Sequence, residues 1–270
     1  MKVLVSNGHN PYFNQALESH IFYHTDDFVL MLYINAPCLV IGRNQNPWKE
    51  INMNNLDIPL VRRLSGGGTV YHDRGNVNFS FIYSEGDTTV EKNFEYIRHR
   101  LSMFGINLEV NARNDLMYKE NKVSGNAFYR RGKRRLHHGT LLVDVDTKDL
   151  WHYLNFDHEK FKCKSVPSKK SPIINLKEVV PYVTSQDVVN LLKYDLEHYM
   201  LDFDVRTLDT DQYKSHTWIL EETPKFQYQY MGLIIDVVKG YIKSDLNSID
   251  NKMFSETLIK KEVEHVSRII

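Results

Sequence analysis

The chain has 270 residues, enough to bury a substantial core and to form one large domain with a small appendage. Its 34 basic and 34 acidic side chains cancel, so no global field favours nucleic acid or an anionic membrane as a partner. The two cysteines lie in no metal-like spacing, and no apolar stretch approaches the roughly 18 residues of a membrane span. An N-terminus without signal-peptide or transit-peptide features predicts, with the cysteine content, a cytoplasmic location.

Helix and strand signals alternate along the chain. A first helix is predicted from Pro11, and its apolar face carries Phe13, Leu17, Ile21 and His24. A second is predicted to begin with a capping box at Thr88 and Glu91 and to end at Gly105, and a third to begin at Thr184. Strands are predicted at residues 28–34, 38–41, 78–83, 116–118, 122–129 and 136–145. Residues 78–83 alternate aromatic and smaller side chains, as in a half-buried strand. The pattern predicts an α+β fold with a mixed sheet and flanking helices.

The most informative stretch runs from Arg62 to Gly68, where two arginines precede three adjacent glycines. Because glycine has no Cβ, a ligand can lie directly against the backbone of this loop. The Arg62 and Arg63 guanidiniums offer fixed charge and bidentate donors suited to phosphate or carboxylate, and loop amides offer further donors. We interpret the run as an anion cradle, with an ordinary tight turn as the alternative.

Four further segments each join a small residue to a polar head group beside a strand-like apolar run. They are residues 71–81, 114–116, 122–127 and 137–142. In order and spacing, and together with residues 10–18 and 41–48, these motifs resemble the lipoate-protein ligase family within the biotin/lipoate ligase superfamily. The resemblance covers residues 8–185 densely and residues 218–226 more loosely.

The resemblance implies a biotin/lipoate ligase-type catalytic domain at residues 1–225 and a shortened accessory domain at residues 226–270. It implies an ATP-dependent reaction in which the lipoate carboxylate attacks the α-phosphate of ATP to give lipoyl-adenylate and pyrophosphate. A lysine amine of an acceptor protein then attacks the mixed anhydride to form an amide. The implied acceptors are apo lipoyl domains of 2-oxoacid dehydrogenase E2 subunits or the glycine cleavage H protein, without a nucleic-acid or membrane partner.

The resemblance also assigns residues to roles. Lys122 matches the lysine of the family's K-x-S-G-x-A motif and is the predicted catalytic cation, which bridges substrate carbonyl and phosphate as negative charge develops. The implied lipoate-binding residues are Arg63, Ser65, Gly66, Gly67, Gly68, Thr69, His72 and His138. The implied ATP- and adenylate-binding residues are Asn76, Asn114, Asp115, Lys122, Ser124, Gly125, Asn126, Lys164 and Ser165. Asp115 is the predicted protein ligand of Mg²⁺.

Two departures from the family pattern concern the ligands. Thr69 stands where the family often has alanine, which predicts a narrower or more polar wall for the acyl chain. The adenylate-binding loop, residues 164–176, is longer than is typical of the family and contains Pro167 and Pro172. Its lysines at positions 164, 169 and 170 keep positive charge but lose the bidentate geometry of arginine.

Alternatives remain at this point. An acyltransferase would form a thioester on a cysteine nucleophile. Related transferases carry that cysteine at the position of residues 111–116, which contain none here, so Cys163 is only a remote candidate for the nucleophile. The altered loop also suits an enzyme that uses preformed lipoyl-adenylate, and a noncatalytic lipoyl-domain-binding homologue is a further class. Ordinary structural roles exist for several site residues: a turn for Lys122, Asn114 and Asp115, the core for His72 and His138, and a bulge for Gly125.

Overall fold

The computed structural model describes residues 1–154, 158–168 and 171–269. Its centre is a six-stranded mixed sheet with the strand order β10-β11-β6-β2-β1-β13. The strands of this sheet are β1 (Lys2–Val5), β2 (Val29–Tyr33), β6 (Asn76–Ser84), β10 (Asn126–Arg131), β11 (Arg134–Leu142) and β13 (Glu197–His198). Strands β1, β2 and β13 run parallel to one another, whereas β6, β10 and β11 pair antiparallel. The predicted α+β class with a mixed sheet is confirmed.

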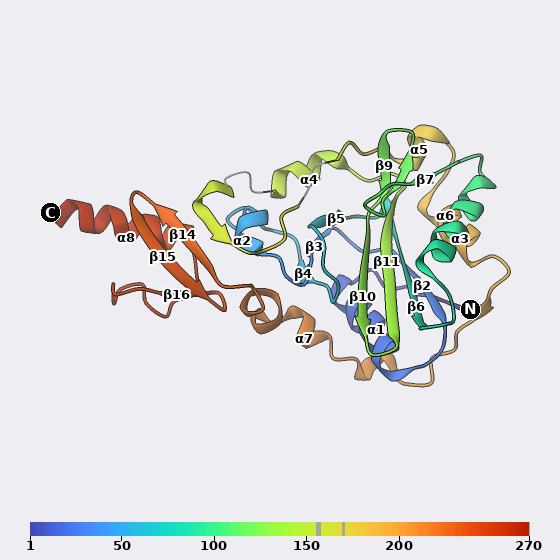
Figure 1. Ribbon diagram of the computed structural model, residues 1–270, viewed down its shortest axis with the longest axis horizontal. Coiled ribbons are helices and arrows are strands. Elements are labelled where there is room, and N and C mark those ends of the chain that lie inside the picture. The colour runs from blue at the N-terminus through green and yellow to red at the C-terminus, as the bar shows by residue number, and fades with distance from the viewer. Residues whose placement is uncertain (155–157, 169–170, 270) are drawn as a thin grey trace.

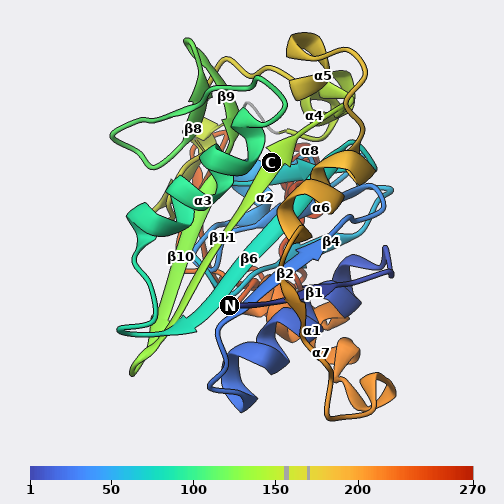
Figure 2. The ribbon, with the colours of Figure 1, turned by 90° about the vertical axis from the view of Figure 1, so that its right-hand side faces the viewer.

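Helices cover both faces of this sheet. The alternating side chains of β2 explain how: Val29 and Met31 pack in one cluster with α1 (Pro11–His24), whereas Leu30 and Leu32 pack in another with α3 (Val90–Ser102) and α6 (Ser185–Lys193). Figure 2 shows α3 and α6 on the side of the sheet that faces the viewer. Since both faces are covered, all of β6 except its last residue is buried, and the half-buried strand predicted at 78–83 is wrong on that point.

Local capping signals set the helix starts. The Asn10 side chain accepts hydrogen bonds from the Tyr12 and Phe13 amides, so α1 begins at the predicted Pro11. The N-cap of α3 is Thr89, whose hydroxyl accepts from the Lys92 amide, rather than the predicted Thr88. Thr184 caps α6 in a reciprocal capping box with Asp187, as the predicted helix start requires.

Smaller sheets flank the central one in the described part of the chain. One sheet places β3 (Cys38–Ile41) between β4 (Leu60–Arg62) and β5 (Val70–His72), and another orders β7 (Glu109–Val110), β8 (Leu116–Tyr118) and β9 (Asn121–Ser124). Short helices complete the framework: α2 (Pro47–Glu50), α4 (Thr147–Tyr153), α5 (Leu176–Val179) and α7 (Thr210–Lys214). Further single turns are 3-10 helices at His158–Lys160 and Val205–Thr207 and a π-helix at Thr217–Glu221.

A fourth sheet lies with helix α8 (Glu256–Ile269) at one end of the molecule (Figure 1). Its strands follow the order β12 (Phe161–Cys163), β14 (Phe226–Tyr230), β15 (Leu233–Val238) and β16 (Tyr241–Lys243). Strand β12 comes from the region before the predicted boundary at 225/226, and Trp48 packs in the same apolar cluster as Phe226 and Phe254. The C-terminal strands thus share a sheet and a core with earlier segments, and the boundary itself stays a prediction.

None of the helices described is long and apolar enough to cross a membrane.

Candidate active site

A pocket of about 310 Å³ opens where the glycine loop, the β9–β10 turn and residues 166–168 meet. The predicted site residues that line it are Arg63, Gly67, Gly68, Thr69, His72, Asp115, Lys122, Gly125, Asn126 and His138. An adjoining, mainly apolar pocket of about 150 Å³ shares Thr69, Lys122, Gly125 and Ser168 with it. The fold therefore brings the glycine loop and all four further sequence motifs to one concave surface.

The other predicted site residues do not line this pocket. They are Ser65, Gly66, Asn76, Asn114, Ser124, Lys164 and Ser165. Lys164 is exposed, and the buried Ser165 hydroxyl lies 2.9 Å from Cys163 Sγ, so the loop contributes Val166, Pro167 and Ser168 to the lining instead. Lys169 and Lys170 fall outside the described residues.

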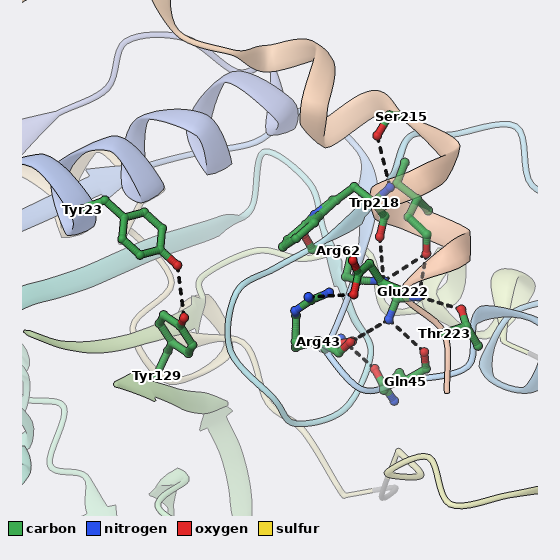
Figure 3. A network of polar contacts seen from close by, with 11 residues as sticks. Tyr23, Arg43, Gln45, Arg62, Tyr129, Ser215, Trp218, Glu222 and Thr223 are labelled. Atoms are coloured by element: carbon green, nitrogen blue, oxygen red, sulfur yellow. Dashed lines mark hydrogen bonds and ion pairs between the residues drawn. The ribbon is translucent and has the colours of Figure 1, made fainter. Parts of the chain in front are cut away.

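Arg62 joins two segments that lie far apart in the sequence instead of facing a ligand. Its fully buried guanidinium donates to the Gly42, Arg43 and Gln45 carbonyls on one side, and to the Trp218 and Ile219 carbonyls and the Thr223 hydroxyl on the other. The Trp218 indole N–H returns a hydrogen bond to the Arg62 carbonyl at 2.7 Å. Figure 3 shows this guanidinium between the Gln45 segment and the helical turn at Trp218. Burial lowers the pKa of Arg62 to about 10.

Arg63 shapes the glycine loop from within. Its Nε donates to Ser65 Oγ at 3.0 Å, Nη1 to the Val40 carbonyl at 3.1 Å, and Nη2 to the Gly66 and Gly68 carbonyls at 2.6 and 2.8 Å. Gly67 between them has a φ of 91°, a left-handed conformation that suits glycine. The expectation that both guanidiniums form an anion cradle is wrong for Arg62, whose donors are all taken up by the protein. Arg63 lines the pocket, although most of its donors are also bound to acceptors of the protein.

His72 lines the pocket and carries a buried, neutral N–H. The Asn14 amide donates to Asn35 Oδ1 at 2.8 Å, which leaves the Asn35 amide to donate to His72 Nδ1 at 3.0 Å. The proton of the neutral ring is then on Nε2, and this buried atom has no hydrogen-bond partner among the described residues. Burial, and to a lesser degree the nearby charges of Arg63 and His138, lowers the pKa of His72 to about 3.

A buried carboxylate orients the second pocket histidine. Glu18 on α1 is fully buried, and its Oε2 accepts from the Ser80 hydroxyl and lies 2.9 Å from His138 Nδ1. Nδ1 is then the donor, and Nε2 lies 2.5 Å from Ser65 Oγ on the glycine loop. Residues from α1, β6, β11 and the loop are joined in this way. The sequence signal for Glu18 was a carboxylate among the apolar side chains of the first helix, and the motif assignment missed it.

Lys122 and Asp115 form an ion pair at the pocket wall. Lys122 Nζ lies 2.7 Å from Asp115 Oδ1, and Arg113 lies 3.4 Å from Asp115 Oδ2. A Cβ at position 125 would come within 3.1 Å of Lys122 Cε and Nζ, so Gly125 leaves room for the ammonium. The Lys122 amide donates to the Pro172 carbonyl, and its own carbonyl accepts from Ile174, which anchors the far end of the long loop beside β9.

Asn126 is held by a third buried histidine, His137. His137 Nδ1 accepts from the Asn93 amide, so its Nε2 carries the proton and donates to Asn126 Oδ1 at 3.1 Å. The Asn126 amide in turn donates to the Asn114 carbonyl at 2.9 Å and to Ser124 Oγ at 3.2 Å. Asn114 has a φ of 61° and ends a turn that begins at residue 111, which confirms the turn role considered for it.

Gln45 connects three loops around the pocket. Its Oε1 accepts from the Gly42 amide at 2.9 Å and from the Thr69 hydroxyl at 3.0 Å, and its Nε2 donates to the Val166 carbonyl and to Ser168 Oγ, each at 3.2 Å. Ser168 Oγ also accepts from the Thr69 amide at 2.9 Å. Thr69 therefore uses its hydroxyl to join the glycine loop to Gln45, a role that the expected polar acyl wall did not include.

Several pocket residues were not assigned an individual role from the sequence: Tyr33, Asn78, Arg113, Val166, Pro167 and Ser168. All but Tyr33 lie within or beside the predicted motifs and the adenylate-binding loop, whereas Tyr33 lies in the strand predicted at 28–34 and reaches the pocket through packing alone. Among the described residues, no group of three or more His, Cys, Asp or Glu side chains is placed to hold a metal by itself.

Comparison with known proteins agrees with this geometry. Residues 10–197 match the lipoyl protein ligase A/B catalytic domain family. A lipoate-protein ligase A of Blochmanniella floridana is 40% identical over 208 residues, which are 74% of this chain and only 62% of that protein. The P. falciparum protein LipL1, solved in complex with lipoate, has a TM-score of 0.72 at 27% identity over 97% of this chain and 94% of its own. A lipoate-protein ligase A bound with ATP shares the fold, with a TM-score of 0.64 at 22% identity over 78% and 93% of the two chains. The chain thus belongs to the lipoyl protein ligase A/B catalytic domain family.

Proposed function

We propose that the protein is an ATP-dependent lipoate-protein ligase, which forms lipoyl-adenylate and transfers the lipoyl group to a lysine of an acceptor protein. The observation that carries this proposal is the position of Lys122 in a pocket that the glycine loop also lines. The related proteins that are named for this reaction, or that bind lipoate or ATP, support the choice of substrates. The reaction needs no protein nucleophile, and the polar groups in the pocket wall suit a mechanism based on positioning and charge neutralisation.

The two substrates would meet at the Lys122 ammonium. Negative charge develops on the phosphate and acyl oxygens as the lipoate carboxylate attacks the α-phosphate, and a compact cation held at that point stabilises it. The His72 Nε2–H is a second donor that stays neutral at physiological pH and lacks a partner among the described residues. Gly67 and Gly68 let the acyl chain approach the loop backbone, while Tyr33 and Val40 supply apolar surface to the same pocket.

Mg²⁺ fits this pocket through one carboxylate. Asp115 lines the pocket beside Lys122 and is the acidic residue among its lining side chains. Mg²⁺ commonly binds one or two carboxylates and keeps its other ligands as waters and substrate phosphates, so one carboxylate is compatible with a nucleotide-bound ion. Asp115 would hold the ion, which when bound neutralises phosphate charge. The Lys122 ammonium lies 2.7 Å from this carboxylate, so the ion and the catalytic cation would share it.

The proposed acceptors are apo lipoyl domains of 2-oxoacid dehydrogenase E2 subunits or the glycine cleavage H protein. This assignment rests on the lipoate chemistry and on family membership. A cytoplasmic location stays a prediction from the sequence.

A thioester-forming transferase receives no support from either cysteine. Cys38 is buried in β3, and burial raises the pKa of its thiol, which disfavours the thiolate nucleophile. Cys163 lies outside the pocket lining, with its Sγ 2.9 Å from Ser165 Oγ and 3.8 Å from Lys49 Nζ. Use of preformed lipoyl-adenylate is the second candidate, because the adenylate-binding loop, which lines the pocket through Val166, Pro167 and Ser168, departs from the family pattern.

One assay in two stages tests the proposal. The first stage measures lipoate-dependent exchange of labelled pyrophosphate into ATP, and the second measures transfer to an apo lipoyl domain. We expect both activities. Transfer from synthetic lipoyl-adenylate without exchange would select the half-enzyme, and the absence of both would leave a noncatalytic homologue.

A further inference from the structure

The free edge of the central sheet starts at the pocket. Strand β10 is the outermost strand of the six-stranded sheet, and its first residues, Asn126 and Ala127, line the pocket. From Asn126 the strand runs to Arg131, a span of roughly 17 Å at the usual rise of an antiparallel strand. A chain that pairs with this edge would therefore lead directly from the pocket mouth to the tip of the β10–β11 hairpin.

The hydrogen-bonding pattern between β10 and β11 leaves a row of β10 backbone groups that point away from β11. The Thr140 amide donates to the Gly125 carbonyl, so the pairs that bond across to β11 are those of Ala127, Tyr129 and Arg131. The N–H and C=O groups of Phe128 and Arg130 consequently point away from β11. No backbone partner occupies this side in the part of the chain that the structure describes. Phe128 is also 37% exposed, an uncommon position for a large apolar side chain beside free backbone donors.

The hairpin tip concentrates positive charge in a chain that is neutral as a whole. Residues 130–135 include the cations Arg130, Arg131, Lys133, Arg134 and Arg135. Arg135 pairs with Glu85 at 3.0 Å, and Arg134 donates to backbone carbonyls near Asp27. The exposed Arg130, Arg131 and Lys133 have no carboxylate partner among the described residues. These three cations and the outward groups of Phe128 and Arg130 are called the basic edge below.

The basic edge is braced against helix α1. The Tyr129 hydroxyl lies 3.1 Å from the Tyr23 hydroxyl, and the Arg131 guanidinium lies 5.2 Å from the centre of the Tyr23 ring. Figure 3 shows Tyr23 of α1 and Tyr129 of β10 facing one another. A preorganised strand loses little conformational freedom when a partner binds, which favours recognition by strand addition.

We propose that the basic edge is the docking site of the acceptor domain, which adds an extended strand with acidic side chains along β10 and so places its target lysine at the pocket mouth. The inference rests on the proposed function and deepens it by identifying the surface and the chemistry of the partner. Backbone pairing supplies the register, and the cations at the tip select a strand with carboxylates roughly 17 Å from the target lysine. Gly67 lies beside the start of β10, since a Cβ there would lie 3.8 Å from Ala127 Cβ.

Two pairs of full-length variants test the charge and the backbone separately. Arg130→Glu/Lys133→Glu reverses two tip cations, and its matched control Lys92→Glu/Lys252→Glu reverses two exposed lysines that lie elsewhere. Phe128→Pro removes one outward N–H at an edge position that tolerates proline, and Phe128→Ala keeps that N–H while removing the ring. Transfer to a recombinant apo lipoyl domain of an E2 subunit gives the KM for the acceptor, and pyrophosphate exchange gives the first half-reaction.

For the charge pair we expect the KM for the lipoyl domain to rise about tenfold at low salt in the tip variant and to lose most of its salt dependence, with exchange unchanged. Phe128→Pro should raise that KM more than Phe128→Ala does. An unchanged KM for the lipoyl domain, or an equal rise in the control variant, would overturn the inference. New self-association without a change in this KM would also overturn it, since the cations would then serve to prevent pairing between the edges of two copies. Equal losses of exchange and transfer would assign the hairpin to pocket stability and also overturn it. Absence of exchange and transfer in the unmodified protein would instead refute the proposed function.

Discussion

The Lys122→Met substitution removes one charge from the pocket while keeping most of the side-chain length. Removing one preorganised donor to developing negative charge typically lowers kcat by roughly 10²- to 10³-fold, equivalent to about 2.7–4 kcal/mol. We expect lipoate-dependent pyrophosphate exchange to fall by that factor. Since the ammonium acts mainly on the transition state, KM for lipoate should change much less than kcat.

The same substitution should cost little stability. The side chain of Lys122 is 25% exposed and that of Asp115 is 9% exposed, and Asp115 keeps Arg113 at 3.4 Å and the Asn111 amide at 3.3 Å. The carboxylate is therefore not left without compensation, and a loss of about 1 kcal/mol is expected, well below the roughly 3–5 kcal/mol for breaking a fully buried pair. Thermal unfolding would show this as a midpoint lowered by roughly 2–4 °C.

A matched lysine on the same hairpin provides the control. Lys119 is exposed in the β8–β9 turn and does not line the pocket, so Lys119→Met should leave exchange unchanged. The reasoning about Lys122 would be refuted if exchange in Lys122→Met matched that of the unmodified protein, or if Lys119→Met lost as much activity while remaining folded.

The remaining predictions concern the loops, the thiol and pH. Gln45→Met removes the hydrogen bonds to the Val166 carbonyl and Ser168 and should raise KM for ATP about tenfold, measured by exchange kinetics; an unchanged KM would separate Gln45 from nucleotide binding. Cys163→Ser should retain full exchange and transfer because its Sγ lies outside the pocket lining, and lost transfer would revive the thioester mechanism. Burial lowers the pKa of His72 and of His137 to about 3, so the unfolded chain binds more protons between about pH 3 and 6.5. Each histidine should then reduce the free energy of unfolding by roughly 1.4 kcal/mol per pH unit as pH falls from 6.5 towards 4. Urea denaturation at several pH values should therefore show a shallower dependence of this free energy on pH for His137→Phe than for the unmodified protein.

Predictions that depend on neighbours in the chain agree best with the structure. The helix at Pro11 begins where its Asn10 cap and its proline indicate, and the strand predicted at 116–118 has those bounds. A local pattern failed where two equivalent signals stood side by side, as in Thr88 and Thr89, because only backbone geometry decides which hydroxyl meets the third amide. The half-buried interpretation of residues 78–83 failed because the number of covered sheet faces is a tertiary property.

The candidate site divides in the same way. Motif order was enough to predict that Lys122, the glycine loop and His72 share one pocket, and the structure places all three there. The sequence could not indicate that the Arg62 guanidinium would donate to carbonyls of the helical turn at Trp218, far along the chain. Nor could it indicate the involvement of Glu18, whose His138 partner lies on a distant strand.

By itself, the sequence determined the family, many of the secondary-structure elements and candidate site residues such as Lys122 and His72, since these follow from residue type, local spacing and the order of motifs. Only the tertiary structure decided which polar atoms remain available to a ligand. Asn14 and Asn35 place the proton of His72 on Nε2, which keeps no partner among the described residues, whereas carbonyls surround the guanidinium of Arg62. The physical reason is that a buried donor or acceptor must find a partner wherever packing brings one, and that choice follows the fold rather than position in the chain.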